Sequence, residues 1–138
     1  RAAAAADVIC TATNSSTPVF PAEAAPPGTH INGVGSYTPA MAEIPPETIR
    51  RARVIVDQRL AAWAEAGDLI QPRDAGLIDE DHVAAELGDL VLGRAPGRTA
   101  ADQITCFKSV GKAAQDVAVA QLALAQARVL GLGSEVAL

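Results

Sequence analysis

Residues 28–39 read Gly-Thr-His-Ile-Asn-Gly-Val-Gly-Ser-Tyr-Thr-Pro, an apolar run that passes abruptly into glycines and small polar residues. This transition is typical of a parallel strand that ends at a ligand crevice, because in open α/β sheets ligands lie outside the carboxyl ends of the strands. Gly33 and Gly35 would let a flat ring or a phosphate approach the main chain, with backbone amides left uncovered. The alternative interpretation is a simple glycine-containing turn after a strand.

Two further apolar runs end in the same way. Residues 7–15 pass from Val-Ile-Cys into Thr-Ala-Thr-Asn-Ser, and residues 53–57 pass from Val-Ile-Val into Asp57. Short apolar runs that do not alternate indicate strands buried on both faces. We therefore expect an α/β fold with a parallel sheet and flanking helices, and strands at 6–11, 29–34 and 53–57.

Helix propensity and the positions of proline and glycine predict the next elements. A helix is expected to begin at Pro45-Pro46 and to continue to residue 52, which makes a strand, a helix and a strand in succession. Residues 58–66 favour a second helix, and Gly67 is expected to stop it.

The C-terminal third is predicted by the same reasoning. Asp81 is expected to cap a helix over 82–92, and residues 103–107 are expected to form a short strand. Ser109 is a candidate cap for the last, long helix. Apolar residues recur along that helix at intervals of three to five, which suits packing on another domain or subunit.

Composition narrows the classes of function. The chain has 138 residues, which suits one domain, and aromatic residues make up only 3% of it. A core of Ala, Val, Ile and Leu favours close packing of helices on a sheet over an aromatic platform for nucleic acid. The net charge of −5 also indicates that nucleic acid is not a partner.

The chain is expected to be a cytoplasmic piece of a longer protein. No apolar stretch approaches the roughly 20 residues of a membrane span, so no membrane partner is predicted. Arg1 is not an initiator residue and residues 2–6 lack a signal-peptide pattern, so we expect the true start to lie upstream. Cys10 and Cys106 are expected to be reduced thiols.

Three short patterns are rejected as ligand motifs. Gly-Leu-Gly at 131–133 follows a helix, and Gly111-Lys112 lacks the earlier glycine and the following hydroxyl of a phosphate loop. His30 and His82 have no partner at metal-ligand spacing, so no metal site is predicted. We interpret His30 as a partly buried strand residue with a satisfied ring and His82 as a solvent-facing helix residue.

Three segments remain as the candidate site, at 11–13, 34–36 and 107–111. Each combines small residues with amides or hydroxyls, and all three would lie at one edge of the sheet. The third also precedes a helix N-terminus, whose dipole favours an anionic or electron-rich group.

These segments resemble the ornithine cyclodeaminase and mu-crystallin family of nicotinamide-dependent enzymes. The resemblance extends over nearly the whole chain and rests on several motifs in the same order. They are Ala-Asp-Val-Ile-Cys-Thr-Ala-Thr (6–13), Pro-Gly-Thr-His-Ile-Asn-Gly-Val-Gly-Ser (27–36), Arg-Ala-Arg-Val-Ile-Val-Asp (51–57), Glu-Ala-Gly-Asp-Leu (65–69), Ala-Glu-Leu-Gly-Asp-Leu (85–90) and Phe-Lys-Ser-Val-Gly (107–111).

The resemblance implies the C-terminal half of a Rossmann-like parallel sheet. Residues 1–99 would form the second half of an NAD(P)-binding domain, with the glycine-rich pyrophosphate fingerprint upstream of Arg1. Residues 100–138 would supply a short strand, a turn beside the cofactor and a long C-terminal helix that returns to an oligomerisation domain. The implied assembly is a homodimer.

The resemblance also implies roles for single residues. Thr11, Ala12 and Thr13 would lie beside the ribose and nicotinamide of NAD or NADP. The other implied cofactor contacts are Val34, Gly35 and Ser36 at the nicotinamide end and Ser109 above it, with Lys108 and Gly111 shaping that turn. Tyr37 and Glu65 would lie on the substrate side. The alternative is that Gly35, Ser109 and Gly111 form only a turn and a cap.

Two departures from the family pattern bear on the substrate. Cyclodeaminases and archaeal alanine dehydrogenases carry a catalytic Asp where this sequence has Tyr37, and cyclodeaminases carry a Lys where it has Met41. The sequence looks more like family members that reduce cyclic or linear ketimines, such as pyrroline-2-carboxylate. A reductase of small imino acids and a non-catalytic, mu-crystallin-like binding protein both remain open.

Overall fold

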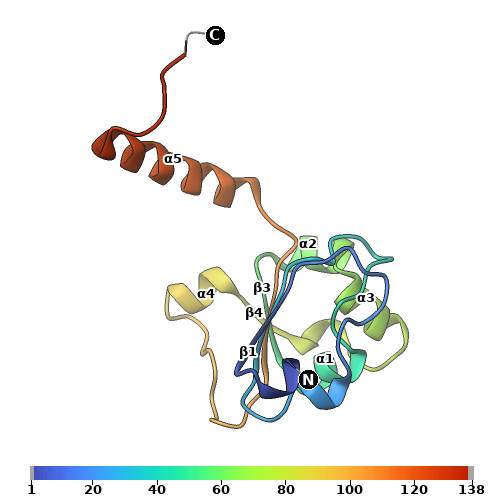
Figure 1. Cartoon of the computed structure of the whole chain (residues 1–138). Coiled ribbons are helices and arrows are strands. Elements are labelled where there is room, and N and C mark those ends of the chain that lie inside the picture. Colours follow the sequence, from blue (N-terminus) through green and yellow to red (C-terminus); the bar gives the residue numbers. More distant parts are fainter. Residues whose placement is uncertain (1, 137–138) are drawn as a thin grey trace.

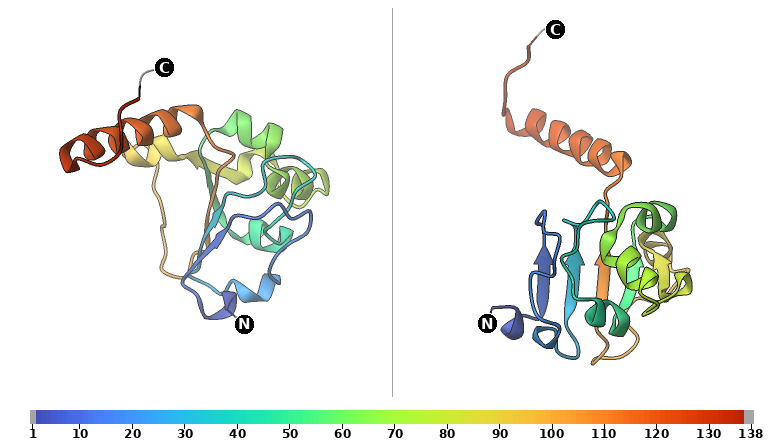
Figure 2. Two further views of the ribbon diagram at one scale, coloured as in Figure 1. Left: turned by 45° about the horizontal axis from the view of Figure 1, so that its top comes forward. Right: turned by 90° about the vertical axis from the view of Figure 1, so that its right-hand side faces the viewer.

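The computed structural model describes residues 2–136, which form one parallel sheet with helices on both sides. The sheet has five strands in the order β1-β2-β5-β3-β4, and every pairing is parallel. Figure 2 shows the strands side by side. Their bounds are β1 Val8–Thr11, β2 His30–Gly33, β3 Arg53–Val56, β4 Val83–Glu86 and β5 Thr105–Lys108.

The helices divide unevenly between the two faces of the sheet. Figure 1 shows α1, α2 and α3 on one side of the strands, α4 on the other, and α5 standing away from the sheet beyond its carboxyl end. Their bounds are α1 Pro46–Arg51, α2 Arg59–Glu65, α3 Gly67–Asp74, α4 Leu87–Val91 and α5 Ala113–Leu130, and short 3-10 turns are η1 Ala3–Ala5, η2 Ala22–Ala24 and η3 Glu80–His82.

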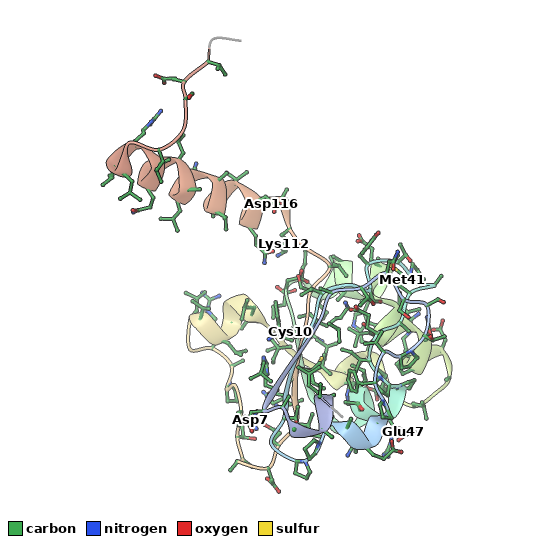
Figure 3. The ribbon with its side chains drawn as sticks, viewed as in Figure 1. Asp7, Cys10, Met41, Glu47, Lys112 and Asp116 are labelled. Carbon is green, nitrogen blue, oxygen red and sulfur yellow. The ribbon has the colours of Figure 1, made fainter. Side chains whose placement is uncertain are left out.

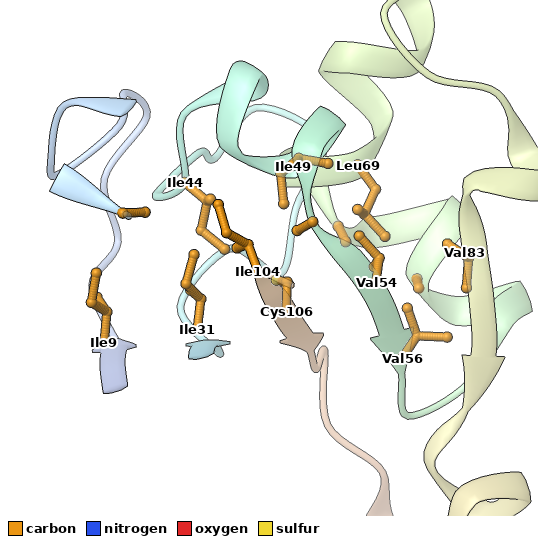
Figure 4. Close-up of a cluster of buried hydrophobic side chains, with 14 of the residues drawn as sticks. Ile9, Ile31, Ile44, Ile49, Val54, Val56, Leu69, Val83, Ile104 and Cys106 are labelled. Atoms are coloured by element: carbon orange, nitrogen blue, oxygen red, sulfur yellow. The ribbon is translucent and has the colours of Figure 1, made fainter. Parts of the chain in front are cut away.

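The apolar core lies between the sheet and α1 and α3. Each strand contributes at least one inward side chain, and Ile44, Ile49 and Leu69 cover them (Figure 4). The contributing strand residues are Ile9, Ile31, Val54, Val56, Val83 and Cys106. Burying one Ile or Leu side chain stabilises the fold by about 1.5–3 kcal/mol, so this layer holds the sheet in place.

The predicted fold class is confirmed, and so are four predicted strands. The strands predicted at 6–11, 29–34 and 53–57 contain β1, β2 and β3, and β5 overlaps the strand predicted at 103–107 and extends one residue beyond it, to Lys108. The helix expected after Pro45 is also present as α1. Each observed strand is one or two residues shorter than its apolar run, because only the paired residues form the ladder.

The helix predicted over 82–92 is wrong in its first half. Residues 83–86 form β4, which pairs with β3, and only 87–91 are helical. Asp81 lies inside the turn η3 and caps no helix. Val83 and Ala85 point into the protein and Ala84 points outward. Pairing along the sheet has therefore overridden the helix propensity of Ala and Glu.

Gly67 begins a helix as well as ending one. The predicted helix over 58–66 is present as α2, but α3 follows at once and was not predicted. A side chain at position 67 would come within 2.7 Å of the carbonyl oxygen of Pro39 and 2.8 Å of that of Thr38. Glycine is required here because the start of α3 packs directly on the backbone of the loop after β2.

The last helix begins later than predicted. Its N-cap residue is Lys112, and no side chain caps it, so Ser109 is not the cap. Every residue of α5 from Ala113 to Gln126 is exposed. Within residues 2–136, no helix combines the length and apolar character that crossing a bilayer requires.

Candidate functional site

The carboxyl edge of β1, β2 and β5 brings the three predicted segments together. Because these strands are neighbours, the loops that leave them lie side by side. The Val34 N–H donates to the Thr11 carbonyl at 3.0 Å, and the Ser109 N–H donates to the Gly33 carbonyl at 3.0 Å. Figure 3 shows Met41 and Lys112 at this end of the molecule and Asp7 and Glu47 at the opposite end.

A buried carboxylate, that of Glu43, joins the first two segments. Its Oε2 accepts the Thr11 hydroxyl at 2.9 Å and the Gly35 N–H at 2.7 Å, and its Oε1 accepts the Thr13 N–H. The side chain is fully buried. Burial raises the pKa of Glu43, but the hydrogen bonds from Thr13, Thr11 and Gly35 outweigh it, so the pKa lies below its ordinary value. Glu43 is therefore ionised at neutral pH.

The close approach to Glu43 explains why position 35 is glycine. A side chain there would overlap the backbone of Thr13 and the Glu43 carboxylate. At Gly33, an added carbon would meet the side chain of Ile44 at 2.7 Å. Both glycines are required by packing within the protein. The expectation of uncovered amides is wrong at Val34, Gly35 and Ser109, because these N–H groups bond within the protein.

Behind Glu43 lies a second buried carboxylate, that of Asp68 in the first turn of α3. Its Oδ1 accepts the N–H groups of Glu43 at 2.7 Å and Ile44 at 2.9 Å. Its Oδ2 lies 3.5 Å from the Nζ of Lys108, and both side chains are fully buried. The Lys108 Nζ also donates to the Gly33 carbonyl at 3.1 Å. Lys108 therefore links β5 to β2 and to α3.

Burial shifts the ionisation of two groups near this pair. Burial raises the pKa of Asp68, although the N–H donors of Ile44 and Glu43 and the Lys108 charge oppose the shift. Burial, assisted by the nearby Asp68 charge, raises the pKa of the Cys106 thiol to about 12. Cys106 is free and buried, and Cys10 is free and exposed. Cys106 is therefore an inert thiol in the folded protein.

A third buried carboxylate, that of Asp57, holds the turn after β5. Its Oδ2 accepts the Ser109 hydroxyl at 2.8 Å, the Val110 N–H at 3.0 Å and the Gly111 N–H at 2.9 Å. Its Oδ1 accepts the Gln58 N–H at 2.8 Å. Gly111 has φ of 87°, a conformation that favours glycine. Asp57 therefore shapes the turn that the sequence assigns to the cofactor side.

The predicted site residues fall into buried and exposed groups. The buried ones are Thr11, Gly35, Ser36, Lys108 and Ser109, and the exposed ones are Ala12, Thr13, Val34, Tyr37 and Gly111. The buried group fixes the backbone, and the exposed group lines the edge where a ligand could lie. Glu65 is exposed at the end of α2, and no hydrogen bond or ion pair between described residues joins it to this edge.

Neither histidine lies in this cluster. The prediction for His30 is confirmed, since its ring bonds to the Thr105 hydroxyl at 2.8 Å and to the Asn32 amide oxygen at 3.2 Å. His82 was expected to face solvent on a helix, and this is wrong. It lies in η3, is half-buried, and its Nε2 lies 2.8 Å from the carbonyl oxygen of Ile49. No group of three metal-ligating side chains was found among residues 2–136.

The patterns in the sequence did not predict Glu43, Asp57 and Asp68 as part of the candidate site. Each had a signal, because Glu43 is a lone charge between Ala42 and Ile44, Asp57 ends a buried strand, and Asp68 lies in the Glu-Ala-Gly-Asp-Leu motif. A single charge in an apolar context indicates a buried, paired group, since unpaired charges are not buried.

Three hollows among the described residues lie near the sheet, and one of them, of about 610 Å³, lies beside β1 and includes Cys10 and Thr11 in its wall. A cavity of about 370 Å³ opens beside Asp57, between α4 and the start of α5, with Glu86 and Lys112 in its wall. Another, of about 400 Å³, lies on the α4 face of the sheet between His30, Arg98 and neighbouring residues. This last hollow is a feature of the sheet face and not of the candidate site.

The parallel sheet and its flanking helices define an α/β domain of the Rossmann type, with the loops after β1, β2 and β5 at one edge of the sheet. The family model of the ornithine cyclodeaminase/mu-crystallin family matches residues 1–129. The chain belongs to this family.

Curated relatives extend the comparison. The chain is 43% identical over 132 residues to the Delta(1)-pyrroline-2-carboxylate reductase of Bacillus cereus, covering 95% of this chain and 40% of that protein. It is 35% identical over 130 residues to the alanine dehydrogenase of Archaeoglobus fulgidus, covering 94% of this chain and 40% of that protein. The chain thus spans about two fifths of the length of these relatives.

Solved structures agree with the sequence relatives. The structure of Thermococcus litoralis Delta(1)-pyrroline-2-carboxylate reductase in complex with NADH and L-proline matches with a TM-score of 0.89 and 38% identity, over 98% of this chain and 42% of that one. The iminosuccinate reductase of Paracoccus denitrificans in complex with NAD+ matches with a TM-score of 0.82 and 37% identity, over 96% and 40%. Both neighbours bind a nicotinamide cofactor.

Proposed function

We propose that this chain is part of an NAD(P)H-dependent oxidoreductase that reduces a small cyclic or linear ketimine, with pyrroline-2-carboxylate as the first candidate. The observation that carries the proposal is the match to a reductase described in complex with NADH and L-proline, at 38% identity over 98% of this chain. L-Proline is the product expected from reduction of pyrroline-2-carboxylate.

The residues of this chain fit a binding and orienting role. The bound nicotinamide would supply the hydride. Thr13 and Val34 would hold the cofactor ring against the carboxyl edge, with Thr11 and Ser109 fixing the backbone beneath it. Tyr37, which is 52% exposed, would line the substrate side. A phenol is a poor base at neutral pH, which suits reduction of a preformed imine better than release of ammonia.

The assembly and compartment are proposed on separate grounds. An archaeal alanine dehydrogenase described as a dimer with bound NAD matches with a TM-score of 0.82 and 35% identity. We propose a homodimer for the full-length protein on that likeness. Two free thiols, Cys10 and Cys106, support a cytoplasmic location.

The test is an assay of the full-length protein for consumption of NADH and NADPH. Pyrroline-2-carboxylate, piperideine-2-carboxylate and pyruvate with an amine are the substrates, and ornithine is tested separately for release of ammonia. We expect turnover with an imine and none with ornithine. Tyr37→Phe should lower the rate only modestly, well short of the roughly 10²- to 10⁴-fold loss typical of a general acid or base.

Two outcomes would overturn this assignment. Ammonia release from ornithine would indicate cyclodeaminase chemistry. Cofactor binding without turnover of any imine would indicate the non-catalytic, mu-crystallin-like alternative. The 138-residue chain alone is expected not to turn over.

A further inference from the structure

Two buried carboxylates accept hydrogen bonds from the loops of the candidate cofactor site. Glu43 receives groups from the segments after β1 and β2, and Asp57 receives groups from the turn after β5 and from the start of the segment after β3. Glu43 lies later in the same connection between β2 and α1 that contains 34–36, and Asp57 directly follows β3. Glu43 is fully buried and Asp57 is 6% exposed, so solvent cannot replace either one.

Most donors to these carboxylates have no other acceptor among the described contacts, and the exception is the Gly111 N–H, which also donates to the Ser109 hydroxyl at 3.1 Å. Of the described contacts of Thr13 and Gly35 as backbone donors, the one to Glu43 is the only one for each residue. The Ser109 hydroxyl and the Val110 N–H likewise bond to Asp57. A backbone N–H that loses its partner in a buried setting costs free energy, so the loops would move to satisfy it if the acceptor were removed.

We propose that Glu43 and Asp57 are positioning residues for the nicotinamide-binding edge. Glu43 positions the segments 11–13 and 34–36, and Asp57 positions the turn at 109–111. The proposal rests on the proposed function, because it assumes that a nicotinamide cofactor lies on these loops. Each carboxylate acts through the loops and makes no contact with the cofactor.

Amide substitutions test the two residues with little change in shape. Glu43→Gln keeps the side-chain length, but one of its two accepting oxygens becomes an NH₂ group that faces an N–H donor. Asp57→Asn has the same effect on the turn at 109–111. The matched controls are Glu47→Gln and Asp74→Asn, whose side chains are 51% and 62% exposed and pair with Arg50 and Arg73 on the surface. Figure 3 shows Glu47 at the end of the molecule opposite Met41 and Lys112.

The first measurement is the dissociation constant of NADH for full-length protein, by titration calorimetry. We expect Glu43→Gln and Asp57→Asn each to weaken binding by about tenfold or more, as loss of charge-assisted hydrogen bonds would predict. The two control variants should bind within about twofold of the wild type. If the first pair does not fold, Thr11→Val and Ser109→Ala remove one donor each and should weaken binding in the same direction.

The second measurement separates positioning from general stability. Amide hydrogen exchange of the full-length protein without cofactor should speed up in Glu43→Gln at Thr13 and Gly35, and in Asp57→Asn at Val110 and Gly111. Neither variant should change exchange at the loop held by the other. Ser109→Ala should weaken NADH binding less in the Asp57→Asn background than in the wild type, because its hydroxyl acts through Asp57.

The outcomes distinguish this inference from the proposed function. NADH affinity unchanged in Glu43→Gln and Asp57→Asn would overturn the inference and leave the reductase assignment intact. Exchange that speeds up uniformly across the sheet, with affinity falling only as the fold is lost, would also overturn it. A wild type that binds NADH but reduces no imine would overturn the reductase assignment, while the shifted affinities of the variants would still support the inference. A wild type that binds no nicotinamide cofactor would overturn both.

Discussion

The two faces of the sheet are built from the same strands and behave very differently. On the face covered by α1 and α3, Ile31 and Val54 are fully buried. On the face toward α4, the alternate residues of the same strands are more open, and Val8 in β1 is 54% exposed. Parallel sheets are normally covered on both faces, and here α4 and the loop after it cover only the middle of the second one.

Both the facing direction and the position of the strand in the sheet set the cost of a change, since Ile55 in β3 is 7% exposed and Val8 at the edge in β1 is 54% exposed. Cys10 and Cys106 are both strand thiols, yet one is exposed and the other buried. The buried ion pair also lies on the covered face, where the side chains of Asp68 and Lys108 are fully enclosed. Substitutions at matched pairs of residues, one buried and one exposed, therefore test this difference in burial directly.

The largest expected difference is in the reactivity of the two thiols. At pH 8, a thiol with a pKa of about 12 is ionised in roughly one molecule in ten thousand, and Cys106 is also shielded from reagent. In this chain, Cys10 should react with a disulfide reagent at least roughly a thousandfold faster than Cys106. Absorbance of the released thiolate measures both rates. Two fast thiols in the folded chain would contradict the burial of Cys106, and denaturant should make the two rates similar.

The buried ion pair should give the next largest effect. Asp68→Asn or Lys108→Met alone leaves an uncompensated buried charge and should lower the free energy of unfolding by about 3–5 kcal/mol. The double variant removes both charges and should lose much less than the sum. Urea denaturation of the two single variants and the double variant measures the coupling.

An exposed pair provides the control for this cycle. Glu47 and Arg50 lie on the surface of α1, with both side chains 51% exposed and 2.8 Å between their nearest atoms. The same cycle with Glu47→Gln and Arg50→Met should give a coupling of only about 0–1 kcal/mol. Equal couplings for the two pairs would contradict the enclosed setting of Lys108.

Two valines compare a covered position in the inner strand β3 with an open position in the edge strand β1. Val54→Ala removes two methyl groups from the covered face and should cost about 2 kcal/mol of unfolding free energy. Val8→Ala makes the same change on the open face and should stay within about 0.5 kcal/mol. Thermal and urea unfolding of the two variants measure the difference, and a cost at Val8 comparable to that at Val54 would show that the open face is covered in solution.

The difference between inner and edge strands explains which elements could be predicted from the sequence. Residues 53–57 contain the continuous apolar run Val-Ile-Val because β3 lies inside the sheet, and such a short run is typical of a buried strand. β4 is an edge strand of Val-Ala-Ala-Glu, a composition that favours a helix, and its pairing with β3 is a tertiary contact that no local pattern encodes. α3 was missed because Gly67 and Pro72 are typical helix breakers.

The candidate site was predictable only in part. The glycines and hydroxyls at 11–13, 34–36 and 109–111 stand out because they interrupt apolar runs. Glu43 lies 32 residues from Thr11, and Asp57 lies 52 residues from Ser109. Each carboxylate is therefore remote in sequence from at least one of the loops that it holds, and spacing arguments detect only local partners. Their roles follow from the folded geometry.

The smallest effect concerns the pH dependence of stability, where Glu43 and Asp68 have opposite signs. The pKa of Glu43 is lowered in the fold, so its contribution is complete above its ordinary value of 4.5 and is lost as the pH falls through the folded value. The pKa of Asp68 is raised from 3.8, so the folded state takes up a proton first, and acidification through the raised value favours folding.

Free energies of unfolding from urea titrations between pH 3 and pH 7 test both signs. The stability advantage of the wild type over Glu43→Gln should be full near pH 6 and should shrink below about pH 4.5. For Asp68 the reference is the Lys108→Met background, in which no ammonium group holds the carboxylate ionised. There, stability should rise on acidification, and adding Asp68→Asn should remove that rise. An advantage over Glu43→Gln that stays constant down to pH 3 would mean that the Thr11, Thr13 and Gly35 donors do not stabilise the ionised form, and the arrangement of the edge around Glu43 would have to be abandoned.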